Sequence, residues 1–255
     1  MANHLRDDRE GGRIIISSHR QGGVSHFPYK SLNLSYGVGD DPQCVAENRQ
    51  RLKTLGPFAH FLSARQVHGD AIFVAQEVFS ADLEVDGYDA LMTERAGIGL
   101  LIQQADCQAV MLYDPTHPAI AAVHCGWQGS VRNILGKTVQ AMHDWYDTPA
   151  SVIKAYISPS LGPCCAEFVN HARELPPAFL AFQERKNYFN FWEISRIQLL
   201  QAGLDAAHIR LAGQCTSCSA DHFSYRRACR QGDGRTGRCA TVIGLVKDRY
   251  GGTAG

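Results

Sequence analysis

The chain has 255 residues, of which 45% are hydrophobic and 20% charged, and these ordinary globular values exclude disordered, collagen-like and coiled-coil proteins. Lysine plus arginine and aspartate plus glutamate number 25 each, so the formal net charge is zero. That balance excludes the basic footprint of nucleic-acid binders and of polybasic membrane-surface proteins, and it favours a small molecule as the partner.

The first half of the chain predicts several strands and one helix. Three consecutive isoleucines predict a first strand over residues 13–18. Asp41 is expected to cap a helix that begins at Pro42, because aspartate accepts from free N–H groups and proline suits the first turn. Val45, Arg49 and Leu52 recur along it at helical spacing, so the helix is amphipathic. Short apolar strands are then expected at 71–78, 99–103, 109–113 and 120–124.

The second half continues with a tight turn at 126–129 and a helix over 131–145. We further expect a buried strand at 153–158, a short helix at 196–202 and a closing strand at 240–247. Strands that cluster without regular alternation with helices favour an α+β sandwich over a doubly wound sheet. No G-x-G-x-x-G motif follows a strand and no Walker A sequence occurs, which argues against dinucleotide and P-loop sites.

One domain is expected over residues 13–248, between a flexible N-terminus (1–12) and a flexible tail (249–255). No apolar run approaches the roughly 20 residues that span a bilayer. The nine cysteines are an odd number, and acidic residues stand where a signal peptide would have its apolar core. We therefore expect a cytoplasmic protein with reduced thiols, no membrane or nucleic-acid partner, and a monomeric or weakly homo-oligomeric state.

Three short segments each place a metal-ligating side chain at a strand end. They supply His68, Cys107 and His124, which are 39 and 17 residues apart. Zinc accepts imidazole nitrogen and thiolate sulfur, and a catalytic zinc site keeps a fourth position open for water. The spacing itself is not diagnostic, so a core histidine, a buried thiol and a hydrogen-bonded histidine remain an alternative. Gly69 and Gly126 favour the metal site because they let backbone approach the ligands closely.

The same segments carry a resemblance that covers nearly the whole chain, from about residue 18 to residue 246. The sequence resembles the YfiH-type laccase-domain family, whose members are also called multicopper polyphenol oxidases or purine nucleoside phosphorylases. The matching motifs occur in the family's order, at 22–25, 31–34, 38–42, 47–49, 66–69, 104–107, 122–129, 161–165 and 223–227.

This resemblance implies a fold, a metal and an activity. The fold is an α/β/β/α sandwich of mixed sheets flanked by helices, and His68, Cys107 and His124 match the zinc-binding, catalytic triplet. The implied chemistry is phosphorolysis of adenosine, inosine and methylthioadenosine, together with adenosine deamination. An older interpretation is laccase activity on polyphenols. Copper is less expected than zinc, because the eleven histidines form no H-x-H pair of the kind that multicopper oxidases use.

Further candidates follow from residue type and motif position. Asp106, beside Cys107, is a candidate general acid, general base or orienting group, although a strand-end cap or an arginine partner explains it equally well. Guanidinium groups match oxyanions, but arginine is more often a surface residue or an ion-pair partner. The candidates for phosphate or ribose contact on this ground are Arg49, Arg226 and Arg227.

Aromatic and polar side chains complete the candidate substrate site. Trp127 and Phe223 are candidates for stacking on a purine, although most aromatics in such a chain belong to the core. His26 and Asn33 lie in glycine- and serine-rich loops from which they could reach ribose hydroxyls, and Asn33 could equally cap a turn.

Two departures from the family pattern bear on chemistry. Gln128 replaces a usual arginine, and the missing cation could weaken phosphate handling more than deamination. The adjacent pair Cys164-Cys165 is interpreted as packing or pocket wall, because adjacent cysteines are poor joint zinc ligands. Four more cysteines read Cys215-x2-Cys218-x10-Cys229-x9-Cys239, of which only the first half has zinc spacing. Free thiols are favoured there over a second zinc or a redox pair.

Two other classes of function remain open. A thiol hydrolase would use Cys107 as nucleophile with His124 or His68 as base, acting on an amide or acyl bond. The family resemblance makes a cell-wall precursor such as a UDP-muramyl amino acid one substrate for it. A non-catalytic binding module is the third class, and the retention of all three candidate ligands argues against it.

Overall fold

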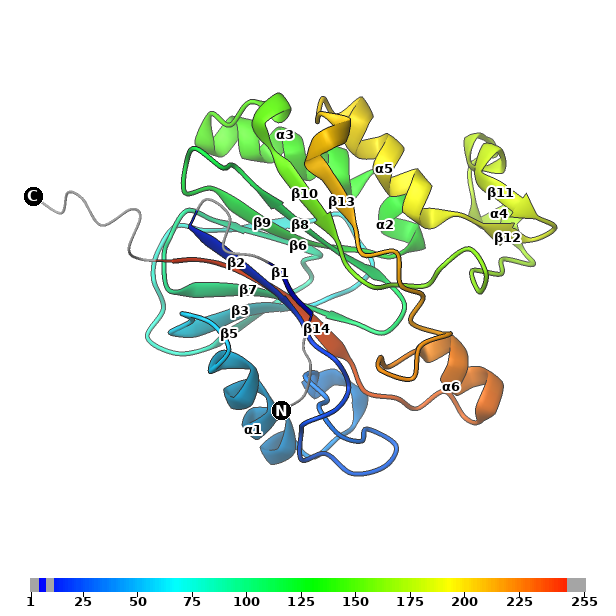
Figure 1. Cartoon of the computed structure of the whole chain (residues 1–255), viewed down its shortest axis with the longest axis horizontal. Helices are drawn as coiled ribbons and strands as arrows, with labels where there is room; N and C mark the ends of the chain where they lie inside the picture. The colour runs from blue at the N-terminus through cyan, green and yellow to red at the C-terminus, as the bar shows by residue number, and fades with distance from the viewer. Residues whose placement is uncertain (1–4, 8–11, 247–255) are drawn as a thin grey trace, which may run out of the picture.

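Two six-stranded mixed sheets stack face to face, and helices cover the outer face of each (Figure 1). The computed structural model describes residues 5–7 and 12–246. The first sheet contains, in spatial order, β1 (Leu5–Asp7), β2 (Arg13–Ser17), β14 (Cys239–Leu245), β7 (Ile98–Gln104), β3 (His60–Arg65) and β5 (Leu83–Asp86). The second contains β13 (Ile209–Leu211), β10 (Lys154–Ile157), β8 (Gln108–Tyr113), β9 (Ile120–Cys125), β6 (Ala90–Thr93) and β4 (Ile72–Ala75).

The helices lie on both sides of the two sheets. Helix α1 (Pro42–Lys53) packs on the first sheet, where Leu52 joins a core with Phe61 and Val242. Helix α3 (Ile134–Tyr146) packs on the second sheet, where Met142 joins a core with Val110. The remaining elements are α2 (Trp127–Val131), α4 (His171–Glu174), α5 (Phe191–Gln201), α6 (Tyr225–Gln231) and the hairpin strands β11 (Gln183–Arg185) and β12 (Tyr188–Phe189). The expected α/β/β/α sandwich in an α+β domain is therefore confirmed.

A third core fills the space between the sheets. It includes Leu100 from β7, Met111 from β8, Ala122 from β9 and Ile243 from β14, none of which is exposed. These strands are covered on both faces, which explains why they read in the sequence as continuous apolar runs rather than alternating ones.

Connections that cross from the first sheet to the second recur three times along the chain. They join β3 to β4, β5 to β6 and β7 to β8. Each crossover ends a strand of one sheet and begins a strand of the other, so the three connections meet along one side of the sandwich. This arrangement positions the candidate site.

Several local predictions were wrong in their boundaries. The expected turn at 126–129 contains the start of α2, and the expected helix over 131–145 begins only at Ile134. Asn133 separates the two helices because it adopts a left-handed backbone (φ 55°), and its side chain accepts from the Gly136 N–H to cap α3. The expected helix at 196–202 is longer. Asn190 caps α5, which begins at Phe191, five residues before the predicted start.

The ends of the expected domain are only partly described. The predicted flexible segments 1–12 and 249–255 lie outside the described residues, except for 5–7 and 12. Among the helices that the structure describes, none combines the length and the apolar character needed to cross a bilayer.

Candidate metal centre

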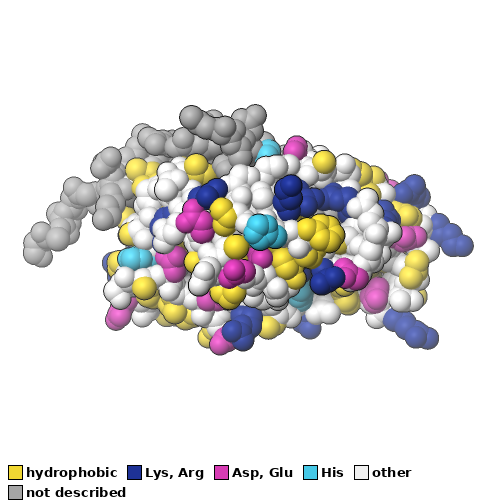
Figure 2. All heavy atoms as spheres, turned by 90° about the horizontal axis from the view of Figure 1, so that it is seen from below, with side chains coloured by type: hydrophobic (Ala, Val, Ile, Leu, Met, Phe, Trp, Pro, Cys, Tyr) yellow, Lys and Arg dark blue, Asp and Glu magenta, His cyan; other side chains and the backbone are white. Residues whose placement is uncertain are grey.

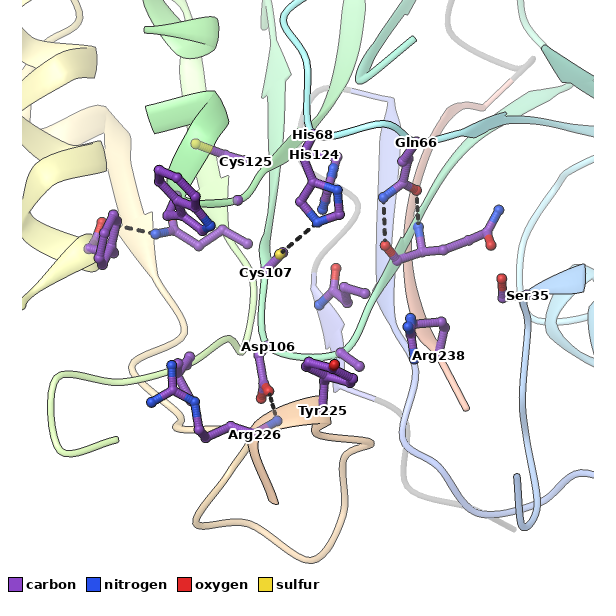
Figure 3. Close-up of a pocket in the computed structure, with 18 of the residues that line it drawn as sticks. Ser35, Gln66, His68, Asp106, Cys107, His124, Cys125, Tyr225, Arg226 and Arg238 are labelled. Carbon is purple, nitrogen blue, oxygen red and sulfur yellow. Dashed lines mark hydrogen bonds between the residues drawn. The ribbon is translucent and has the colours of Figure 1, made fainter. Parts of the chain in front are cut away.

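A cavity of about 1050 Å³ opens beside the crossover connections (Figure 3). Its lining includes side chains from the first half of the chain, such as His68 and Cys107, and from the C-terminal segment, such as Tyr225 and Arg238. A concave site of this size, with a few convergent polar groups, is typical of small-molecule binding.

Three candidate ligands converge on this cavity. His68 lies on the β3–β4 crossover, Cys107 on the β7–β8 crossover and His124 within β9. Their ligand atoms all lie within 4.8 Å of one another, and Cys107 Sγ is 3.8 Å from His68 Nε2 (Figure 3). The sequence prediction that these three side chains come together agrees with this placement.

The backbone around the three ligands is specialised for close approach. His68, and Asp106 directly before Cys107 in the chain, adopt positive φ values of 59° and 92°, a backbone conformation that is uncommon for residues other than glycine. At Gly126 an added Cβ would lie 3.0 Å from His68 Cδ2 and 3.1 Å from Cys107 Sγ. A side chain at residue 126 would therefore fill the space between the ligands.

Asp89, on the β5–β6 crossover, holds two of the ligands in place. Its carboxylate accepts from His124 Nδ1 (2.7 Å) and from the backbone N–H groups of His68 (3.0 Å) and Gly69 (2.6 Å). Burial opposes the charge of Asp89, yet the hydrogen bond and charge of His124 keep the pKa of this carboxyl low. A carboxylate on Nδ1 directs Nε2 of His124 towards the cavity as a ligand.

Cys107 and His124 form a charged pair when no metal is bound. Burial opposes ionisation of the thiol, but the charge and hydrogen bond of His124, followed by those of His68, lower the pKa of Cys107 to about 6. Burial likewise disfavours the imidazolium, but the Cys107 thiolate and Asp89 raise the pKa of His124 to about 9. Cys107 is therefore already a thiolate at neutral pH, the form that binds metal.

The donor set fits a zinc-type ion. Two imidazoles and one thiolate are three protein ligands that leave one coordination position open, the composition of catalytic zinc sites. The Asp89–His124 hydrogen bond supplies the usual outer partner of a ligating histidine. Multicopper sites need more histidines than this cluster contains, and the other cluster of metal-type ligands in the described residues contains only cysteines.

The ion pair between the Cys107 thiolate and the His124 imidazolium gives a first testable prediction. In metal-free protein, alkylation of Cys107 by iodoacetamide is expected to accelerate as pH rises through about 6, because the reactive thiolate forms there. The His124→Asn substitution removes the largest charge that favours the thiolate, so the midpoint should move up towards the ordinary thiol value. Alkylation rates followed by mass spectrometry of the Cys107 peptide measure both midpoints. An unchanged midpoint in the variant would contradict the pairing.

Asp106 and Arg226 form the other side of the cavity. The Asp106 carboxylate accepts from the Arg226 backbone N–H (2.6 Å) and from Thr216 Oγ1 (2.7 Å), so both of its oxygens are engaged (Figure 3). The Arg226 side chain lines the cavity and donates from Nη1 to the carbonyl of Cys165 (3.1 Å). Trp127, the first residue of α2, also lines the cavity.

Other residues proposed from the sequence lie outside the cavity lining. Arg49 is buried behind the wall, where it pairs with Glu84 (2.9 Å). Asn33 is buried, and its Oδ1 accepts from the Arg238 N–H (2.9 Å). His26 is exposed, and Phe223 is fully buried. Arg227 donates to the carbonyls of Thr216, Ser217, Ser219 and His222.

Sequence reasoning missed Asp89, Arg238 and Tyr225. The last two line the cavity, and Asp89 orients its ligands. A carboxylate directly before an apolar strand was the available signal for Asp89. Nothing local distinguishes Arg238 from a surface arginine, because its place in the site depends on how the C-terminal segment crosses the sandwich.

Arg132 occupies the helical turn after Gln128. Arg132 Nη1 donates to the backbone carbonyl of His68 (2.8 Å) and lies 3.3 Å from Gln128 Oε1. A cation thus lies one turn after Gln128 and contacts the His68 loop, although Arg132 itself lies outside the cavity lining.

Comparisons with known proteins agree with this fold. The family described as multi-copper polyphenol oxidoreductase laccase matches residues 14–246. A Streptomyces griseus protein named purine nucleoside phosphorylase ORF3 is 35% identical over 92% of this chain and 95% of its own length. Purine nucleoside phosphorylase YlmD from Geobacillus stearothermophilus is 34% identical over 91% of this chain and 90% of its own.

Solved structures show the same architecture. The crystal structure of YlmD from Geobacillus stearothermophilus matches with a TM-score of 0.82 at 30% identity, over 94% of each chain. That of the hypothetical protein YfiH from Bacillus licheniformis matches with a TM-score of 0.83 at 27% identity, over 96% of this chain and 97% of the other.

Proposed function

The chain belongs to the multi-copper polyphenol oxidoreductase laccase family, and from that membership we propose that it is a zinc-dependent purine nucleoside phosphorylase that also deaminates adenosine. The relatives named purine nucleoside phosphorylase support the phosphorolysis. The observation that carries the metal dependence is the convergence of two imidazoles and one thiolate on one cavity. The substrates we propose are adenosine, inosine and methylthioadenosine, with phosphate as the second substrate.

His68, Cys107 and His124 would hold the zinc ion. When bound, such an ion supplies Lewis-acid chemistry, which polarises an oxygen and lowers the pKa of water. Asp89 keeps Nδ1 of His124 protonated, so that Nε2 stays available as a ligand.

Asp106 is assigned an orienting role rather than a proton-donating one. Both of its oxygens already accept hydrogen bonds, from the Arg226 N–H and from Thr216 Oγ1, so neither oxygen is free to exchange a proton with a substrate. Asp106 thereby fixes the left-handed backbone that presents Cys107 to the cavity.

The purine is proposed to bind against the aromatic wall. Trp127 and Phe168 line the cavity with their rings at right-angled packing, 6.3 Å between centroids, and Tyr225 lies on the opposite, C-terminal segment. Aromatic faces of this kind stack on heterocyclic bases.

Phosphate is proposed to bind Arg226 and Arg238, whose side chains line the same cavity as Cys107. Guanidinium groups match phosphate oxygens, and burial lowers the pKa of Arg238 without removing its role as a cation at neutral pH. Lysine and arginine side chains also gather at the end of the molecule that carries α4 and the β11–β12 hairpin (Figure 2).

Arg238→Gln gives a prediction that separates the two reactions. Loss of the cation is expected to raise the KM for phosphate by about tenfold, the effect of one charged hydrogen bond. Adenosine deamination uses water and should keep its kcat/KM. Steady-state assays with and without phosphate measure both, with Arg235→Gln, an exposed arginine paired to Asp233, as the matched control. Equal losses in the two reactions would contradict the assignment of Arg238 to phosphate.

The proposed function is tested on protein purified without an affinity metal. Plasma mass spectrometry measures bound metal, and chromatography identifies the products from adenosine. Adenine and ribose 1-phosphate, formed only with phosphate, would establish the phosphorylase, whereas inosine and ammonia would establish the deaminase. Metal-free protein without turnover on any of the three nucleosides would overturn the proposal.

A thiol hydrolase is the second candidate, and one observation favours it. The Cys107 thiolate and the His124 imidazolium form the ion pair that activates cysteine nucleophiles. The two candidates differ in their response to metal removal: chelation should abolish the nucleoside reactions, whereas it should expose the Cys107 nucleophile and increase turnover of an amide or acyl substrate.

A further inference from the structure

Four cysteines from distant parts of the sequence meet beside the cavity wall. Cys164 and Cys165 lie in a turn after β10, and Cys215 and Cys218 lie between β13 and α6. Their sulfur atoms all lie within 4.8 Å of one another, and all four thiols are free. We call this group the cysteine cluster.

The cysteine cluster differs from what the sequence suggested. The Cys215-x2-Cys218 pair is completed by Cys164 and Cys165 rather than by Cys229 and Cys239. Cys239 is buried at the start of β14, a strand of the first sheet, and is not part of the cysteine cluster. The sequence interpretation of Cys164-Cys165 as packing or pocket wall considered that pair alone. Adjacent cysteines are poor joint ligands by themselves, but the fold adds a second pair whose sulfur atoms lie within 4.8 Å of theirs.

The distances between the sulfur atoms fit four thiols bound to one metal ion better than they fit a disulfide bond. Cys218 Sγ lies 3.6 Å from Cys164 Sγ and 3.5 Å from Cys165 Sγ, so it is placed almost equally between two partners. A disulfide needs a separation of about 2.05 Å and joins only two sulfurs. Four sulfurs on one zinc, each at about 2.3 Å, lie about 3.8 Å apart in a tetrahedron.

The two loops are built to hold these sulfurs. Ser160 forms a β-bridge with Cys215, and the Gly162 N–H donates to Cys215 Sγ (3.3 Å), which fixes the position of this sulfur. The Ser219 N–H donates to the Cys215 carbonyl (3.0 Å), which closes the turn that brings Cys218 back to the cluster. At Gly162 an added Cβ would lie 3.0 Å from Cys215 Cβ, so the close approach requires glycine.

The charges around the cysteine cluster favour thiolates only in part. Arg185 and Arg226 donate to the carbonyls of Cys164 and Cys165, at 3.0 and 3.1 Å. Burial, followed by hydrogen bonds from Cys215 and Cys218, raises the pKa of Cys164. Burial opposes ionisation of Cys165, but hydrogen bonds from Cys218 and Ser217 lower the pKa of its thiol. The geometry remains the basis for a shared ion, because Cys218 Sγ already contacts the sulfur atoms of both Cys164 and Cys165.

We propose that Cys164, Cys165, Cys215 and Cys218 bind a structural zinc ion, separate from the one at His68, Cys107 and His124. Four thiols release their protons to solvent as the ion binds. The ion joins the 160–168 loop, which forms part of the cavity wall, to the loop that carries Thr216. Because Thr216 donates to Asp106, the second ion stabilises the backbone that presents Cys107.

Metal content in full-length variants tests this proposal. Wild-type protein purified under reducing, anaerobic conditions is expected to contain about two zinc ions per chain, and Cys218→Ser about one. Cys229→Ser, which changes an exposed thiol outside the cluster, should keep both. An unchanged zinc content in Cys218→Ser would overturn the proposal. One zinc in the wild type that is lost in Cys218→Ser would instead support the cysteine cluster and contradict the zinc site at His68, Cys107 and His124.

A second measurement covers the case in which Cys218→Ser does not fold. In Cys107→Ser, where the first site is lost, X-ray absorption should find the remaining zinc surrounded by sulfur alone at about 2.3 Å. Nitrogen neighbours at that zinc would overturn the proposal. So would a disulfide between the two cysteine pairs, found by mass spectrometry in the same anaerobic protein.

Discussion

Substitution of His68, Cys107 or His124 by alanine, one at a time, is expected to remove the catalytic zinc and to lower kcat/KM for nucleosides by more than 100-fold, beyond the roughly 10–100-fold that loss of an outer ligand partner costs. Each of the three supplies one ligand atom to the same cluster, so two remaining ligands would leave the ion weakly held. Metal analysis and steady-state kinetics on the same preparations measure both losses, which should occur together.

Cys44→Ala is the matched control for Cys107→Ala. Both thiols are half-buried, but Cys44 lies on α1, away from the candidate metal centre. Its thiol donates a hydrogen bond to the carbonyl of Val24 (3.9 Å). Its metal content and kinetics should match the wild type. If Cys107→Ala kept the metal and lost activity, Cys107 would be a nucleophile rather than a ligand, and the thiol hydrolase would become the better description.

Asp89→Asn is expected to weaken zinc binding by about 10–100-fold without unfolding the chain. The amide keeps the shape of the carboxylate, but it loses the charge that favours protonation of His124 at Nδ1 and one acceptor for the backbone N–H groups of the His68 loop. Competition with a chromogenic chelator measures the affinity. In metal-free Asp89→Asn, the pKa of His124 should also fall from about 9, since Asp89 raises it in the wild type.

Asp114→Asn controls for the loss of a buried carboxylate as such. Asp114 is likewise unexposed, and it accepts from the backbone N–H groups of Thr116 and His117 and pairs with the His117 ring (3.2 Å). It lies in the β8–β9 turn, outside the cavity lining. Equal loss of zinc affinity in the two variants would show that Asp89 acts through stability alone.

The three candidate ligands were proposed from the sequence chiefly through the family resemblance, because their spacing is not diagnostic. Residue type narrows the choice, since zinc accepts imidazole nitrogen and thiolate sulfur, but it does not exclude core roles for the same residues. The burial of the central strands on both faces was also predictable, since β7, β8 and β9 appear in the sequence as continuous apolar runs. Strands β3, β5 and β6 were missed. Strands β5 and β6 have only four residues each, and β3 and β5 include charged or polar residues that interrupt the apolar pattern.

Contacts between distant segments could not be predicted from local patterns. Arg238 enters the cavity only because β14 returns to the centre of the first sheet, between β2 and β7. The cysteine cluster depends in the same way on the pairing of the 160–168 loop with the 214–219 loop, about fifty residues later. Spacing rules consider cysteines along one stretch of sequence, so they do not connect Cys215 and Cys218 with the distant pair Cys164-Cys165.

The three crossovers between the sheets link metal binding to folding. His68 and Cys107 lie on chain segments that leave the first sheet, whereas His124 belongs to the second, so no single sheet holds all three ligand atoms. Only the folded chain would therefore bring the three ligands together, and an ion at the proposed site would stabilise the fold by RT ln(1 + [M]/Kd) relative to the unfolded ensemble. The concentration of free metal would then set how firmly the two sheets stay together, so withholding the ion is expected to lower the melting temperature as well as the activity.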